Sequence, residues 1–220
     1  MELCAPSGAF ATIYNPSWHL PLVSIEHLTA EHLRQHYKRH AKRVDSFRPD
    51  DRLSHDQRAE LSDYKRSGYD RGHMAPDADS WSEESEYDTF VLSNMIPQAP
   101  LNNRGLHAHI EGTVRHMAIK AGDLYVFTGP LFNNNNVQSL HRRVPIPDHL
   151  YKLVYDQQTN QAAAYVEENT NDESAAYQVV SEEDLVKMTG VDFLPGKNPA
   201  MLDLPKPIKS YGGNNSHYSR

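Results

Sequence analysis

Short runs of β-branched and aromatic residues, separated by polar turn residues, predict that this chain contains several strands. Such runs pack well on the pleated surface of a sheet, whereas the polar residues between them favour turns. The strands are expected at residues 10–14, 90–92, 123–128, 150–155 and 161–166. Only the polar residues DQQTN separate the last two runs, which predicts a hairpin.

Apolar residues spaced three or four positions apart predict one long helix over about residues 103–120. Its apolar stripe consists of Leu106, Ile110, Val114 and Met117. Two shorter helices are predicted from capping boxes, in which a serine is followed three positions later by an acidic residue. These boxes start at Ser80 and Ser181, and Gly190 is expected to end the second helix.

The order of these elements predicts the fold class. Strands and helices alternate irregularly with hairpin-length connections, which is typical of an α+β domain with mainly antiparallel strands. A chain of 220 residues can bury a core without disulfides, and Cys4 is its one cysteine. We expect one domain over residues 1–220, with a core at about 10–200, an exposed asparagine loop at 133–136, and a flexible tail at about 206–220.

The charge is distributed unevenly along the chain. A net charge of −7 argues against electrostatic capture of nucleic acid by the whole surface. However, the segment from Arg34 to Arg71 contains more Lys and Arg than Asp and Glu. Taken alone, this basic segment is typical of an ordinary solvated face, but it leads directly into the stretch YDRGHMAP.

Two features of the sequence bear on the compartment of the protein. No apolar run approaches the roughly 20 residues that a membrane helix needs, so no membrane partner is expected. The first ten residues, MELCAPSGAF, lack the basic and apolar regions of a signal peptide. Either the protein stays inside the cell or a leader has been removed, and we favour a secreted or periplasmic protein over a cytoplasmic one.

The stretch YDRGHMAP places Asp70, Arg71, Gly72 and His73 side by side, shortly before Pro76. Gly72 has no Cβ, so the backbone can bend there or approach another segment closely. Pro76 prevents a helix from running through the stretch. We therefore expect His73 on a turn or a strand end, with Asp70 able to orient a ring or a turn and Arg71 able to reach a phosphate.

A second set of polar residues repeats every four positions along the predicted long helix. It consists of Asn103, His107, Glu111 and Arg115. Residues at this spacing share one helix face for two to three turns. On its own the set is typical of a solvated helix side, where an acid and a base four residues apart contribute only ~0.3–0.5 kcal/mol.

Taken together, these residues resemble the DNA/RNA non-specific endonuclease family, which includes endonuclease G and the Serratia-type nucleases. YDRGHMAP is followed by DTFVLSNMIPQ and then by Asn103, Glu111 and Arg115, in a spacing similar to that of the endonuclease G branch. The resemblance covers about residues 10–200. It implies the ββα-metal fold, with a central and mainly antiparallel sheet flanked by helices.

The resemblance also implies an activity and a catalytic site. It implies a metal-dependent, sugar-non-specific endonuclease that hydrolyses phosphodiester bonds in DNA and RNA, with His73 as the general base. Mg²⁺, for which Mn²⁺ can substitute, would bind directly to Asn103 and through water to Glu111. Arg48 would stabilise the transition state, and Arg71 would contact phosphate or carboxylate groups.

The remaining implications concern substrate contacts and partners. The residues expected to bind substrate are Arg71, Asn94, Gln98 and Arg115. Single-stranded and double-stranded DNA and RNA are the expected substrates, and relatives are commonly homodimers.

The chain departs from the family pattern at two positions. Relatives often carry an aromatic residue where this chain has His107, and a leucine where it has Asn102. The two adjacent asparagines leave the metal ligand ambiguous, and we choose Asn103 because it keeps the eight-residue step to Glu111.

Two alternatives remain open from the sequence. A zinc hydrolase could use the cluster of His107, His109 and Glu111, although the chain has no HExxH motif and no pair of cysteines. Zn²⁺ would activate such an enzyme, whereas the nuclease should prefer Mg²⁺ or Mn²⁺. The second alternative is a catalytically inactive homologue that only binds nucleic acid.

Overall fold

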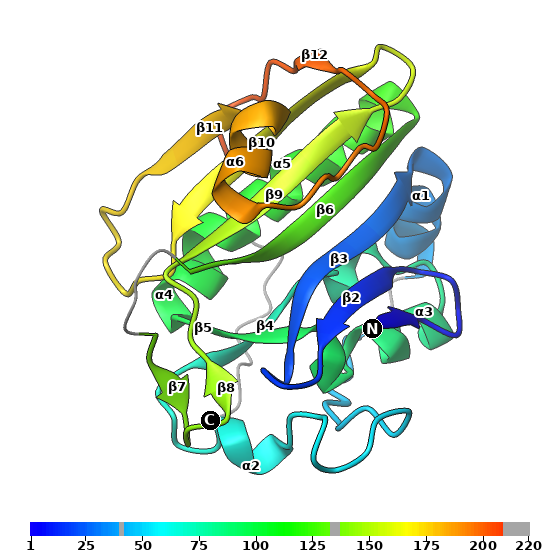
Figure 1. Cartoon of the computed structure of the whole chain (residues 1–220). Coiled ribbons are helices and arrows are strands. Elements are labelled where there is room, and N and C mark those ends of the chain that lie inside the picture. The colour runs from blue at the N-terminus through cyan, green and yellow to red at the C-terminus, as the bar shows by residue number, and fades with distance from the viewer. Residues whose placement is uncertain (40–41, 133–136, 209–220) are drawn as a thin grey trace.

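One eight-stranded sheet forms the centre of the molecule in the computed structural model (Figure 1). The structure describes residues 1–39, 42–132 and 137–208. The strand order is β1-β2-β3-β6-β9-β10-β11, and β12 pairs with β10. These strands are β1 Glu2–Cys4, β2 Ala11–Asn15, β3 Leu20–Thr29, β6 Asp123–Leu131, β9 His149–Asp156, β10 Gln161–Glu168, β11 Tyr177–Ser181 and β12 Ala200–Met201. All neighbours are antiparallel except β10 and β12, which confirms the predicted α+β class.

Helices cover both faces of this sheet. The helices are α1 Ala30–Arg39, α2 Leu61–Tyr64, α3 Glu83–Thr89, α4 Pro100–Asn102, α5 Ala108–Ala121 and α6 Glu182–Thr189. Leu185 of α6 packs in one apolar cluster with Phe127 and Tyr151, while Ile110 and Val114 of α5 pack in another cluster on the opposite face. The central strands are therefore buried on both sides, and none of the helices in the described ranges is long and apolar enough to cross a bilayer.

Two small hairpins lie outside the main sheet. β4 Asp70–His73 pairs with β5 Met95–Gln98, and β7 Ser139–Leu140 pairs with β8 Val144–Pro145. The β4–β5 hairpin is followed directly by the helical segment that contains α4 and α5, which together give the ββα unit. The predicted asparagine loop and most of the predicted tail lie outside the described residues.

The predicted helix ends are correct for α6 and wrong for α3. The Ser181 hydroxyl accepts from the backbone N–H of Asp184 at 3.1 Å, and Gly190 ends α6 with a φ of 70°. By contrast, Ser82 rather than Ser80 caps α3. The Ser80 hydroxyl donates to the carbonyl of Asp77 at 2.6 Å, because Ser80 ends a short 3₁₀ turn at Asp77–Asp79 instead of starting the helix.

The prediction of a strand at residues 90–92 is also wrong. This run makes only one isolated bridge, between Val91 and Arg48, and then enters a 3₁₀ turn at Leu92–Asn94. Phe90 and Leu92 are apolar because they are buried in the core, and not because they belong to a ladder. A short apolar run cannot distinguish these two causes.

The long helix begins earlier than predicted and is not regular. Pro100 starts α4, as proline suits the first turn of a helix. A π-helical turn at Asn103–His107 then widens the helix before α5 begins at Ala108. Such π turns occur frequently at functional sites.

Candidate active site

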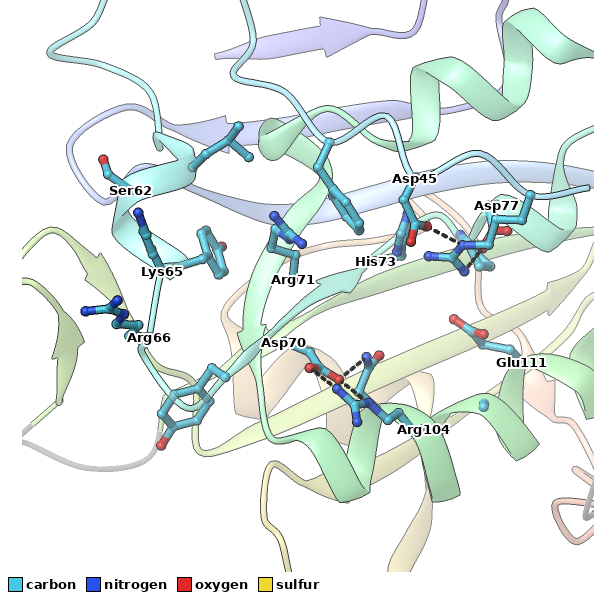
Figure 2. A pocket seen from close by; sticks show the side chains of 18 residues that line it. Asp45, Ser62, Lys65, Arg66, Asp70, Arg71, His73, Asp77, Arg104 and Glu111 are labelled. Carbon is cyan, nitrogen blue, oxygen red and sulfur yellow. Dashed lines mark hydrogen bonds and ion pairs between the residues drawn. The ribbon is translucent and has the colours of Figure 1, made fainter. Parts of the chain in front are cut away.

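A cleft of about 860 Å³ opens between β4, the α2 region and the π turn (Figure 2). Four of the residues predicted from the sequence line it, namely Arg71, His73, Asn103 and Glu111. The cleft therefore joins the YDRGHMAP stretch to the polar face of the long helix, as the sequence predicted.

His73 occupies the last position of β4, opposite Met95. The glycine before it is required by the packing, because a Cβ on Gly72 would overlap the side chain of Gln98. The strand end predicted for His73 and the close approach predicted at Gly72 are both observed. The β4–β5 hairpin thus fixes the backbone that carries the imidazole.

The His73 ring is 8% exposed and packs edge-on against Phe90, with ring centroids 5.0 Å apart. Its Nε2 has no hydrogen-bond partner among the described residues. Burial lowers the pKa of His73 to about 3, and the nearby Arg43 guanidinium adds to this effect. The imidazole is therefore neutral at physiological pH.

Asp70 holds the side chain of Asn103. Its carboxylate accepts from Asn103 Nδ2 at 2.9 Å and from the Arg104 guanidinium at 2.8 and 2.7 Å. The amide nitrogen of Asn103 is thereby fixed, whereas its Oδ1 accepts no hydrogen bond from the part of the chain that the structure describes. Asn103 lines the cleft, so this oxygen is available to a ligand.

Asn102 points to the opposite side of the helix and is 5% exposed. Its Oδ1 accepts from Gln98 Nε2 at 2.7 Å, and its Nδ2 donates to Glu167 Oε2 at 3.1 Å. Both ends of this amide are used inside the protein, so Asn102 has no free group to offer to the cleft.

Glu111 is held by a buried histidine. His107 is 2% exposed and lies between two carboxylates, with Nδ1 hydrogen-bonded to Glu167 and Nε2 3.3 Å from Glu111 Oε1. Burial alone would lower the pKa of His107, but the two carboxylates raise it to about 9. Burial would likewise raise the pKa of Glu111, yet His107 lowers it to about 2. Glu111 is therefore ionised in the cleft.

Glu167, the second partner of His107, was not predicted from the sequence. It lies on β10, far from the motif in the chain, and is 3% exposed. The one signal in the sequence is its position at the end of the apolar run from Ala162 to Val166, where a carboxylate can be buried with the strand.

Arg115 does not line the cleft. Its guanidinium donates to Asp79 at 2.9 Å. Burial lowers the pKa of Arg115, but the charges of Asp79 and Glu111 reverse that effect and raise it. Arg115 thus has a partner inside the protein, and its direct contact with substrate stays a prediction.

Arg48 also lies away from the cleft. It donates to the Tyr87 carbonyl at 2.6 Å, stacks 3.5 Å above the Tyr87 ring, and lines a separate cavity of about 300 Å³. Arg43 does line the cleft, and its guanidinium donates to Asp45 and Asp77 at 2.7 and 2.8 Å. Sequence reasoning chose Arg48 and missed Arg43. Both arginines lie close to Phe47 in the chain, so their positions alone do not distinguish them.

Asn94 and Gln98, two other residues expected to bind substrate, are both 0% exposed. The Asn94 side chain accepts from the Ser24 hydroxyl and donates to the carbonyls of Ala75 and Thr89. Asn94 and Gln98 thus hold the β4–β5 hairpin against the rest of the protein.

The zinc cluster of His107, His109 and Glu111, which the sequence left open as an alternative, is not supported by the geometry. Both ring nitrogens of His107 face carboxylates of the protein. Within the described ranges, no three His, Cys, Asp or Glu side chains are arranged to hold a metal ion.

Comparisons with known proteins agree with this arrangement. The sequence profile of the DNA/RNA non-specific endonuclease family matches residues 7–200. "Nuclease C1" of Cunninghamella echinulata var. echinulata is 38% identical over 154 residues, which cover 64% of this chain and 60% of that protein. "Endonuclease G, mitochondrial" of Homo sapiens is 38% identical over 125 residues, covering 56% of this chain and 41% of that protein.

A solved structure has the same fold. It is described as "Crystal structure of the EndoG/EndoGI complex: Mechanism of EndoG inhibition" and matches with a TM-score of 0.73 at 28% identity. The match covers 84% of this chain and 82% of that one. The chain spans between 47% and 63% of the first three relatives that it matches in sequence. By sequence and by fold, the chain belongs to the DNA/RNA non-specific endonuclease family and has the ββα-metal fold.

Proposed function

We propose that this protein is a divalent-metal-dependent endonuclease that hydrolyses phosphodiester bonds in DNA and RNA. One observation carries the proposal. The unpartnered Nε2 of His73 and the free Oδ1 of Asn103 belong to residues that line the same cleft, beside the ionised Glu111. A base, a neutral oxygen donor and a carboxylate are the groups that metal-assisted hydrolysis needs.

The residues fit a hard cation such as Mg²⁺, or Mn²⁺ in its place. Asn103 Oδ1 would bind it directly, because Asp70 fixes the amide with this oxygen free. Mg²⁺ keeps several of its waters, so a single side-chain ligand suffices and Glu111 can accept hydrogen bonds from those waters. When bound, the cation would neutralise negative charge on the phosphate and on the leaving oxygen.

His73 acts as the general base and takes a proton from the attacking water at Nε2. Burial keeps the ring neutral, and the aromatic contacts with Phe47 and Phe90 hold its orientation. A phosphate anion in the cleft raises the proton affinity of the imidazole, because an adjacent negative charge favours the protonated form.

Arginine residues supply the positive charge for the substrate phosphate. We assign to Arg43 the transition-state role that the sequence suggested for Arg48, because Arg43 lines the cleft near His73. Arg71 lines the same cleft, with its guanidinium 4.0 Å above the Phe47 ring. Contacts to the phosphate backbone carry no base information, which agrees with cleavage that is not sequence-specific.

Incubation with supercoiled plasmid, single-stranded DNA and RNA, with and without Mg²⁺, tests this function. We expect cleavage of all three substrates with Mg²⁺ or Mn²⁺ and none with EDTA. Activity that survives chelation contradicts the metal mechanism. Binding without cleavage in the presence of Mg²⁺ indicates the inactive homologue instead.

A further inference from the structure

The cleft has a second end that the catalytic residues do not occupy. Figure 2 shows Ser62, Lys65 and Arg66 at one end of the cleft, with Asp77 and Glu111 at the other and Arg71 between them. Lys65 and Arg66 directly follow α2, and both are exposed. This end of the cleft therefore carries adjacent positive charges in contact with solvent.

The cations of the cleft differ in how they are paired. Arg43 and Arg104 form ion pairs with Asp77 and Asp70 at 2.8 and 2.7 Å. Neither Lys65 nor Arg66 forms an ion pair with any described residue of the chain. Two neighbouring like charges with no protein anion repel each other, so an anion placed between them is stabilised.

The turn that carries Lys65 and Arg66 has a defined backbone conformation. Arg66 has a φ of 57°, a left-handed conformation that is uncommon for a residue other than glycine. The turn is closed by hydrogen bonds from the N–H of Lys65 to Ser62 and from the N–H of Ser67 to Tyr64, both at 3.3 Å. Tyr64 is buried in the core and anchors the turn there. The turn therefore fixes the backbone positions from which Lys65 and Arg66 extend.

We propose that Lys65 and Arg66 form a phosphate-binding subsite that holds the nucleic-acid backbone beyond the scissile phosphate. The proposal rests on the proposed function and extends it, because it assigns to two further residues of the cleft a contact with the substrate backbone. The cleft volume of about 860 Å³ is at the upper end of the range of single small-ligand sites.

The subsite has two measurable consequences. Because it binds reactant and transition state equally, its removal raises KM and leaves kcat unchanged. Neutralising a phosphate releases counterions, so the binding constant falls as the salt concentration rises. For single strands, the slope of log K against log [salt] should become less steep by ~0.7 for each phosphate that is no longer neutralised.

The test uses a double variant, Lys65→Gln with Arg66→Asn, and the control Lys197→Gln. Asparagine tolerates the left-handed conformation at position 66, so the turn is kept. Lys197 is exposed and does not line the cleft. Each protein is assayed with Mg²⁺ on a single-stranded oligonucleotide and on the small diester bis(p-nitrophenyl) phosphate.

For the oligonucleotide, the double variant should show a KM raised by about tenfold and a weaker salt dependence, while the control is unchanged. Cleavage of the small diester should be the same in all three proteins. An unchanged KM for the oligonucleotide would overturn the subsite. An equal loss of activity on the oligonucleotide and on the small diester would overturn it as well.

If the wild-type protein cleaves neither substrate, the proposed function fails, and the subsite is then tested by binding alone. Fluorescence anisotropy with a labelled oligonucleotide in EDTA should still show weaker affinity and a smaller salt slope in the double variant than in Lys197→Gln. Equal affinities in that assay would overturn the subsite independently of catalysis.

Discussion

The two sides of the helical segment that contains α4, the π turn and α5 have opposite chemistry. On the sheet side, both polar ends of Asn102 form hydrogen bonds inside the protein, and His107 lies between the carboxylates of Glu167 and Glu111. On the cleft side, Asn103 keeps a free oxygen and shares the cleft with the unpartnered nitrogen of His73. Asn102 and His107 are held by groups of the protein itself, whereas the free oxygen of Asn103 is available to a ligand. Substitutions on the two sides should therefore have different effects.

The largest effect is expected from the base on the cleft side. His73→Ala should lower plasmid cleavage by at least ~10²–10⁴-fold, because it removes the group that accepts the proton. The thermal transition measured by circular dichroism should stay cooperative. Wild-type activity in this variant would contradict the assignment of His73.

The two adjacent asparagines give the sharpest comparison. Asn103→Ala should lower activity by about 10²-fold with little change in stability, because it removes the proposed direct metal ligand. Asn102→Ala should instead lower the free energy of unfolding by about 1–3 kcal/mol, since it leaves buried groups of Gln98 and Glu167 unpaired. Urea unfolding and plasmid cleavage measure the two quantities, and similar reductions in activity would mean that the ligand is misassigned.

The two arginines near Phe47 extend the comparison beyond the helix. Arg43→Ala should lower kcat by about 10²-fold, as is typical when one donor to a developing charge is removed. Arg48→Ala should have a much smaller effect, because Arg48 contacts Tyr87 outside the cleft. A reversed order of these effects would return the transition-state role to Arg48.

The smallest effect is a pH dependence of stability on the sheet side. The pKa of His107 is raised in the folded protein to about 9 from an ordinary value of 6.5. Its contribution to stability is therefore complete below pH 6.5 and declines as the pH rises through 9, with an upper limit of about 3 kcal/mol. Urea unfolding between pH 6 and 10 should show this decline in the wild type and a weaker one in His107→Gln. Parallel profiles in the two proteins would show that His107 is not charged in the fold.

Local chemistry explains which parts of the structure were predictable from the sequence. The β9–β10 hairpin, the cap of α6 at Ser181 and the tight approach at Gly72 each depend on a few consecutive residues. The resemblance to the family also predicted that His73 and Asn103 belong to one site, because family motifs relate residues that are distant in the chain.

The features that could not be predicted depend on packing between distant segments. Burial of Asn94 and Gln98 follows from the position of the β4–β5 hairpin, and a motif alone does not reveal it. The contact between Glu167 and His107 joins β10 to the helix. Strand β3, the longest in the sheet, was missed because apolar residues occupy both of its faces and obscure the alternation. Homodimer formation and secretion stay predictions.

The central claim is that a divalent cation binds between His73 and Asn103. Anomalous diffraction from crystals soaked in Mn²⁺ measures this directly. The account predicts one strong peak within coordination distance of Asn103 Oδ1, on the side of the cleft that faces His73. A peak elsewhere, such as between His107 and His109, with no density beside Asn103, would contradict it.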